Sequence, residues 1–246
     1  ILNTDFSDLM FPEDKKFVDY LITFSTHMPF TTNKNSVCKL LYDIDHENDN
    51  NENTENKDAT KEIVMSEEDC ARRQAKETDY MVSLLLQKLK EKNLYDNTVI
   101  VVFTDHYLYT LEDKTILDKY KETDNNLINN TPFFIWSSNT KKTNIKSVTS
   151  QLNILPTILN LFGVSYNKNN YIGKDALSNN YQGIVFFSDY SWYDGNVYVE
   201  GGSITNNKYL DPTKLEEKNY YISYITKKND LALKYDYFKE KEATKK

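Results

Sequence analysis

The sequence lacks several features that would assign it quickly to a class of protein. No apolar run approaches the roughly 18 residues that a membrane-spanning helix needs, and no signal peptide is visible. Thirty Lys and Arg stand against 37 Asp and Glu, and the net charge of −7 does not indicate a nucleic-acid partner. The chain begins at Ile1 instead of Met, so we expect a piece of a longer protein whose anchor would lie elsewhere.

Cysteine is also scarce, with Cys38 and Cys70 as the two that the chain contains. Because they form no CxxC pair, a zinc site is not indicated, and neither cysteine is placed as a nucleophile. They flank an acidic, Asn-rich insert, residues 43–61, which we expect to be a solvated loop without a site at His46. A disulfide at the base of this insert is one interpretation, and two reduced, buried thiols are the other.

What the chain does contain is a short, strongly apolar run that ends in polar residues. Residues 99–103 (VIVVF) predict a strand buried on both faces of a parallel sheet. Asp105 and His106 follow at its carboxyl end, where open α/β sheets place their sites, and both are good metal ligands. The alternative is a turn aspartate beside a hydrogen-bonded histidine. Thr104 is a conceivable nucleophile, but a strand residue beside a ligand usually points away from it.

Other segments predict the elements around this strand. Residues 17–24 (FVDYLITF) predict a second buried strand, and His27 follows it directly before the Pro29 loop, well placed to reach the same site. Ser66 predicts the start of a long helix with one face packed on the sheet, through Ala71, Ala75, Thr78, Val82, Leu85 and Leu89. A third strand over 132–136, a helix over 150–162 and a strand over 184–187 complete the set.

These elements define an α/β fold with a mostly parallel sheet flanked by helices. The pattern changes after residue 190, because residues 196–200 and 220–225 alternate in hydrophobicity around a Gly201-Gly202 turn. We therefore expect a main domain over 1–190. A small antiparallel sheet with a terminal helix is expected over 191–246.

Four motifs in order resemble the lipoteichoic acid synthase family, in the sulfatase branch of the alkaline phosphatase superfamily. They are residues 25–30 (STHMPF), 94–107 (LYDNTVIVVFTDHY), 132–136 (PFFIW), and 151–164 (QLNILPTILNLFGV) with 173–175 (GKD). The resemblance covers roughly residues 15–180 and implies the carboxyl-terminal part of a catalytic domain with an alkaline phosphatase/sulfatase-like fold.

The resemblance implies a metal-dependent phosphoglycerol transferase that takes glycerol phosphate from phosphatidylglycerol and passes it to a growing polymer. On this mapping Asp105 and His106 are metal ligands, His27 contacts the substrate phosphate or protonates a leaving oxygen, and Thr110 contacts glycerol phosphate. Manganese is the expected ion and magnesium the alternative, since both accept hard oxygen ligands. The parent protein is expected to be membrane-anchored, with this domain on the extracellular face.

Two departures from the family pattern keep alternatives open. The family's threonine nucleophile and a further acidic ligand would lie upstream of Ile1, and Asn153 stands where many relatives carry Asp, although an asparagine still caps a helix. Other members of the fold, namely a sulfatase, a phosphodiesterase or a phosphoethanolamine transferase, fit the same motifs. So does a non-catalytic module that lacks the nucleophile.

Overall fold

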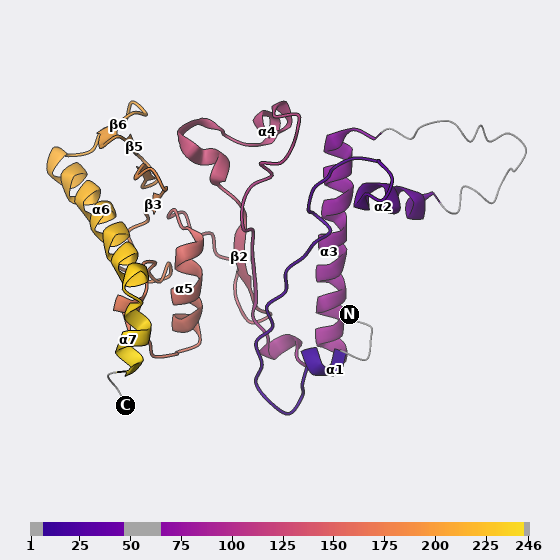
Figure 1. Ribbon diagram of the computed structural model, residues 1–246. Coiled ribbons are helices and arrows are strands. Elements are labelled where there is room, and N and C mark those ends of the chain that lie inside the picture. Colours follow the sequence, from indigo (N-terminus) through magenta and orange to yellow (C-terminus); the bar gives the residue numbers. More distant parts are fainter. Residues whose placement is uncertain (1–6, 47–64, 244–246) are drawn as a thin grey trace, which may run out of the picture. The chain divides into compact units, whose positions relative to one another are not determined.

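The computed structural model describes residues 7–46 and 65–243, which form two compact units (Figure 1). Unit 1 comprises residues 1–141 and unit 2 residues 142–246. The domain boundary that the sequence predicts at 190/191 is a different one, between the main domain and a small carboxyl-terminal part. It stays a prediction. Within the described ranges, no helix is both long enough and apolar enough to cross a membrane.

The longest helix of unit 1, α3 (Glu67–Glu91), begins where the sequence predicts. The Ser66 hydroxyl accepts a hydrogen bond from the Asp69 amide at 3.0 Å, and acidic residues fill the first turn, where they favour the helix dipole. The other helical segments of the unit are α1 (Ser7–Met10), α2 (Val37–Asp45), η2 (Tyr95–Asn97), α4 (Thr115–Tyr120) and η3 (Asp124–Asn129).

The buried face of α3 is largely the predicted one. Leu89 is buried and Ala71, Thr78, Val82 and Leu85 are half-buried, whereas Ala75 is exposed. Cys70 and Gln74, which a search for apolar spacing does not select, are also buried.

The strand predicted from residues 99–103 is β1 (Ile100–Phe103), and the strand predicted at 132–136 is β2 (Phe133–Trp136). They pair antiparallel, with Ile100 opposite Trp136 and Phe103 opposite Phe133. The expected parallel arrangement is therefore not found between the strands that the structure describes. β1 is half-buried instead of fully buried, and β2 is half-buried except at Phe134, which is exposed.

Residues 17–24 were predicted as a buried strand, and this prediction is wrong for the described chain. The segment is extended but joins no sheet, and Val18 is 95% and Ile22 83% exposed. The Tyr20 ring contacts the Phe103 ring at 6.5 Å, so the segment passes beside the end of β1 without forming a ladder. A strand needs a hydrogen-bonded partner as well as apolar side chains, and local sequence does not report the partner.

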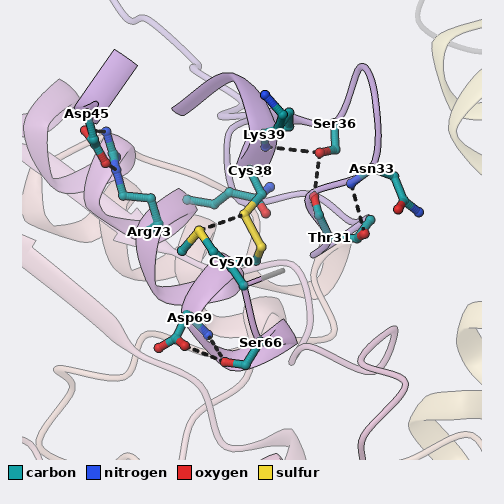
Figure 2. Close-up of a disulfide and its surroundings, with 12 residues drawn as sticks. Thr31, Asn33, Ser36, Cys38, Lys39, Asp45, Ser66, Asp69, Cys70 and Arg73 are labelled. Atoms are coloured by element: carbon teal, nitrogen blue, oxygen red, sulfur yellow. Dashed lines mark hydrogen bonds and ion pairs between the residues drawn. A yellow bond between two sulfur atoms is a disulfide. The ribbon is translucent and has the colours of Figure 1, made fainter. Parts of the chain in front are cut away.

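Cys38 and Cys70 form a disulfide that links α2 to α3 (Figure 2). Both sulfurs lie in a buried core that also contains Phe30, Leu111, Ile116 and Leu117. The insert predicted as a loop over 43–61 begins inside α2, and its residues 47–61 lie outside the described part of the chain.

Unit 2 contains an antiparallel sheet in the order β3 (Val185–Phe186), β4 (Trp192–Tyr193), β5 (Tyr198–Glu200) and β6 (Ser203–Ile204). Gly201 and Gly202, both with positive φ, make the predicted turn between β5 and β6. The predicted helix over 150–162 appears as η4 (Gln151–Asn153) followed by α5 (Ile154–Leu161), with Gly163 at φ 63° ending it. A further short turn is η5 (Lys168–Asn170).

Residues 220–225 were predicted as a strand, and this prediction is wrong. They form the middle of helix α6 (Pro212–Lys234), which is followed by α7 (Tyr237–Ala243). Asp211 caps α6 and Pro212 opens it. Ile222 and Ile225, three residues apart, pack in one cluster with Trp192 and Val199 of the sheet and with Val197, which directly precedes β5. The same apolar residues fit alternation and helical spacing, and the cap decides for the helix.

Candidate metal and phosphate site

Asp105 and His106 lie directly after β1, at the position the sequence predicts, and both side chains face solvent. The carboxylate is 86% exposed and the imidazole 45% exposed. Asp105 Oδ2 lies 3.5 Å from His106 Nε2, while Asp105 Oδ1 accepts a hydrogen bond from the His106 amide at 2.9 Å. The Thr104 hydroxyl oxygen is buried, so it is not presented with them.

The neighbouring backbone fixes which nitrogen of His106 is available. His106 Nδ1 lies 2.7 Å from the Tyr107 carbonyl oxygen, and because a carbonyl only accepts, Nδ1 must carry the proton. The lone pair is then on Nε2, the nitrogen that faces Asp105. A backbone carbonyl in this role is the usual support for a metal-binding histidine.

The pair therefore fits as part of a divalent-metal site. Metal–ligand bonds of about 2.0–2.2 Å place two ligands of one ion roughly 3 Å apart, close to the observed separation of the two donor atoms. Across residues 7–46 and 65–243, however, no group of three or more His, Cys, Asp or Glu side chains gathers around one point. The pair supplies two ligands, and manganese or magnesium requires more oxygen ligands than these.

His27 is also exposed, and it lies in a tight turn at the end of the extended segment. Its amide donates to the Phe24 carbonyl at 3.0 Å, and its ring stacks on Phe24 with centroids 5.1 Å apart. Nδ1 lies 2.8 Å from the Met28 carbonyl, so by the same argument Nε2 is the free nitrogen. His27 therefore presents a nitrogen that can accept or donate a proton at the surface.

Thr110 lies four residues after His106, in a loop that is held by the first residues of α3. The Glu67 carboxylate accepts hydrogen bonds from the amides of Glu112 and Asp113 at 2.7 and 2.9 Å. Glu68 accepts a hydrogen bond from the Tyr120 hydroxyl at 2.5 Å. Glu67 and Glu68 thus fix both ends of the segment between Thr110 and Tyr120.

Hydrogen bonds lower the pKa of the Glu68 carboxyl to about 2. The bond from Tyr120 is the largest cause, followed by those from Lys119 and Arg72. The charged form of Glu68 is therefore the one that this contact between helix and loop requires.

One buried core brings the two candidate segments together. Phe30, three residues after His27, and Tyr107, next to His106, both belong to the cluster around the disulfide. Figure 2 shows Cys38 and Cys70 at the centre of this region, with Arg73 reaching from α3 to the Asp45 carboxylate of α2 at 2.5 and 2.8 Å. The sequence left a Cys38–Cys70 disulfide as one of two interpretations, but it did not predict the apolar core around the two cysteines.

The motifs at 151–164 and 173–175 have a structural role in unit 2. Asn153 is buried, its amide donates to the Lys174 carbonyl at 2.8 Å, and its Oδ1 accepts from the Ser150 amide. A Cβ on Gly173 would lie 1.8 Å from the Leu152 carbonyl oxygen, so only glycine fits there. These residues join two segments of the unit. The Asn153 side chain does not cap α5 as expected, but completes a capping box with Ser150 at the start of η4.

The cavity beside Asn153 is too small for a substrate. Its volume is about 20 Å³, which corresponds to one water molecule, whereas ligand pockets start at roughly 300 Å³. Tyr181 on its wall donates to the Val148 carbonyl at 2.8 Å, and burial raises the pKa of this phenol to about 12. The candidate site of the described chain is therefore the one in unit 1.

The fold and the order of these residues define a class of protein. The sequence profile of the sulfatase family matches residues 4–164, and the chain belongs to that family. A solved structure, the lipoteichoic acid synthase LtaP from Listeria monocytogenes, superposes with a TM-score of 0.63 at 19% identity. The superposed region covers 86% of this chain and 52% of the LtaP chain. The sulfatase-like fold is thereby confirmed, including for a chain whose described strands pair antiparallel.

Within that family the chain is similar to proteins named lipoteichoic acid synthase. The protein from Staphylococcus saprophyticus is 25% identical over 219 residues, which cover 87% of this chain and 31% of the relative. That from Staphylococcus aureus (strain USA300) is 25% identical over 240 residues, covering 91% and 33%. The chain thus spans about a third of the length of these relatives. The resemblance that the motifs carry is confirmed.

Proposed function

We propose that this chain forms the carboxyl-terminal part of the catalytic domain of a metal-dependent phosphoglycerol transferase. The observation that carries the proposal is the Asp105–His106 pair at the end of β1, with its two donor atoms 3.5 Å apart inside the segment that matches the sulfatase family. The relatives named lipoteichoic acid synthase support glycerol phosphate as the transferred group.

Asp105 Oδ2 and His106 Nε2 would hold the ion, with manganese favoured over magnesium because one ligand is an imidazole nitrogen. When bound, the ion supplies positive charge to phosphoryl oxygens and makes a nearby hydroxyl easier to deprotonate. The exposed carboxylate of Asp105 contributes negative charge that offsets part of the charge of the ion. The Tyr107 carbonyl holds His106 in the tautomer that binds a metal.

His27 acts in this proposal as the general acid, because its side chain is exposed and histidine is the residue that most often transfers protons in catalysis. It would donate a proton to the leaving oxygen of the lipid. Thr110 would contact the glycerol phosphate from a loop that Glu67 holds in place. By resemblance, the threonine nucleophile and a further acidic ligand belong to protein N-terminal to Ile1.

The donor in this proposal is phosphatidylglycerol and the acceptor a glycerol phosphate polymer, on the extracellular face of a membrane-anchored parent protein. The buried Cys38–Cys70 disulfide supports an oxidising compartment, since cytosolic proteins rarely keep such bonds.

The test is release of diacylglycerol from fluorescent phosphatidylglycerol by the full-length protein that contains this chain, with manganese present. Asp105→Ala and His106→Ala are expected to reduce the rate by more than about 100-fold, since even losing a supporting residue of a metal site costs roughly 10–100-fold. His46→Ala is the matched control, because His46 ends α2 and stacks on Tyr42 away from these residues. Equal rates in all variants would refute the proposal.

A second candidate function, a non-catalytic module, is favoured by one observation. The described residues bring two ligands together and no third. The sequence of the gene upstream of Ile1 separates the two candidates. A threonine or serine at a strand-to-helix turn, with an acidic ligand before it, supports the enzyme. An upstream sequence without them supports the module.

A further inference from the structure

The most unusual side chain of unit 1 is a glutamine in its core. Gln74 is fully buried, with 0% of its surface exposed, on the inner face of α3. Burying an amide is unfavourable unless it is hydrogen-bonded, so an inward-facing glutamine requires a specific role. Its contacts indicate that role.

The amide nitrogen of Gln74 is hydrogen-bonded to the backbone of the turn that carries His27. Gln74 Nε2 donates to the Ser25 carbonyl at 2.9 Å and to the His27 carbonyl at 3.0 Å, which uses both of its hydrogens. These two acceptors belong to the backbone on either side of Thr26. One buried group of the helix therefore fixes the path of this turn by binding its backbone and not the His27 ring.

Two neighbouring residues on the same face of α3 also hold this segment. Thr78, one helical turn later, has its hydroxyl 3.2 Å from the Ser25 hydroxyl. Cys70, one turn earlier, is cross-linked to Cys38 and packs in the core that includes Phe30. The segment from Ser25 to Phe30 is thus held by three successive turns of one helix.

We propose that Gln74 is a positioning residue for His27, setting the direction in which His27 Nε2 is presented to the substrate phosphate. This inference rests on the proposed function for the identity of the substrate. The position of the ring depends on the two carbonyls that Gln74 binds, on the hydrogen bond from Nδ1 to Met28 and on the stack against Phe24. Of these, the Gln74 amide is the contact that comes from the buried face of α3.

The first test reads the position of His27 directly. The chain has three histidines, so nuclear magnetic resonance of their imidazole nitrogens reports His27 against two internal references, His46 and His106. Gln74→Met, similar in shape but without donors, is expected to shift and broaden the His27 signals and to leave the other two unchanged. Ser83→Ala, which removes a hydrogen bond to the Tyr80 carbonyl farther along α3, is the matched control and should leave His27 close to wild type.

A second variant keeps the test decisive if Gln74→Met does not fold. In Gln74→Glu a carboxylate faces two carbonyl oxygens, and only its protonated form can donate. The difference between the His27 signals of Gln74→Glu and those of the wild type at the same pH is therefore expected to shrink as the pH falls, which a merely structural role would not produce. Unchanged His27 signals in a folded Gln74→Met, or equal changes in all three histidines, would overturn the proposal, as would a difference between Gln74→Glu and the wild type that stays constant with pH.

A turnover assay on the full-length protein separates this inference from the proposed function. Gln74→Met is expected to lower kcat by about 10- to 100-fold with little change in KM, since small misplacements of a catalytic group reach that size. In a variant that already carries His27→Ala it should cause no further loss. Wild-type protein without transferase activity, together with His27 signals that move, would refute the function and leave the positioning intact. Normal transfer by Gln74→Met would refute the positioning alone.

Discussion

Removal of the Cys38–Cys70 disulfide is the perturbation whose size can be worked out most directly. The bond closes a loop with a sequence separation of 32 residues. Cross-linking a loop of this length reduces the entropy of the unfolded chain by an amount equivalent to about 4 kcal/mol at 25 °C. Domains are commonly stable by only about 5–15 kcal/mol, so Cys38→Ala/Cys70→Ala should lose a large share of the stability of unit 1.

The assay is urea unfolding followed by tryptophan fluorescence. The chain has two tryptophans, Trp136 in unit 1 and Trp192 in unit 2, so single-tryptophan variants report each unit separately. With a slope of about 2 kcal/mol per molar urea, the Trp136 midpoint is expected to fall by about 2 M. The Trp192 transition is the internal control, because the disulfide lies in unit 1.

The single variants sharpen this prediction. Cys38→Ala and Cys70→Ala each break the same cross-link, so each should lose about as much stability as the double variant, and their effects should not add. A Trp136 midpoint that does not move in the double variant would refute the reasoning. Two free thiols per chain in the oxidised protein would do the same.

Two further predictions concern other parts of the chain. Gly173→Ala should destabilise unit 2 by about 3 kcal/mol, because its Cβ would lie 1.8 Å from the Leu152 carbonyl oxygen. Gly163→Ala, where the new Cβ meets open space, should cost about 1 kcal/mol. A lower Trp192 unfolding midpoint for Gly163→Ala than for Gly173→Ala would contradict this. The Glu68 carboxyl has its pKa lowered from 4.5 to about 2, so its contribution to stability is complete above pH 4.5 and is lost as the pH falls toward 2. Glu68→Gln should flatten the pH dependence of unfolding in that window, and an unchanged slope would count against the hydrogen bonds from Tyr120 and Lys119.

The elements that the sequence predicts well are those with local signals. Ser66 and the acidic residues after it predict the start of α3, and Gly163 predicts the end of α5, because capping depends on neighbouring residues. The apolar run at β1 predicts a strand and places Asp105 and His106 at its end. These signals are sufficient to propose the site.

The features that the sequence does not predict are those that depend on contacts with residues far away in the sequence. Residues 17–24 have the composition of a strand, but without a hydrogen-bonded neighbour they are extended and exposed. Residues 220–225 fit two periodicities, and the Asp211 cap decides between them. Gln74 is invisible to a search for apolar faces, because its role comes from the Ser25 and His27 carbonyls that the fold brings to it. A polar residue within an otherwise buried helical face is the signal that would have found it.

The central claim, that Asp105 and His106 bind the catalytic metal, is tested most directly by electron paramagnetic resonance of manganese bound to the full-length protein. Coordination by His106 Nε2 predicts a nitrogen hyperfine coupling that is present in the wild type and in His46→Ala and disappears in His106→Ala. The same coupling in His106→Ala would contradict the claim.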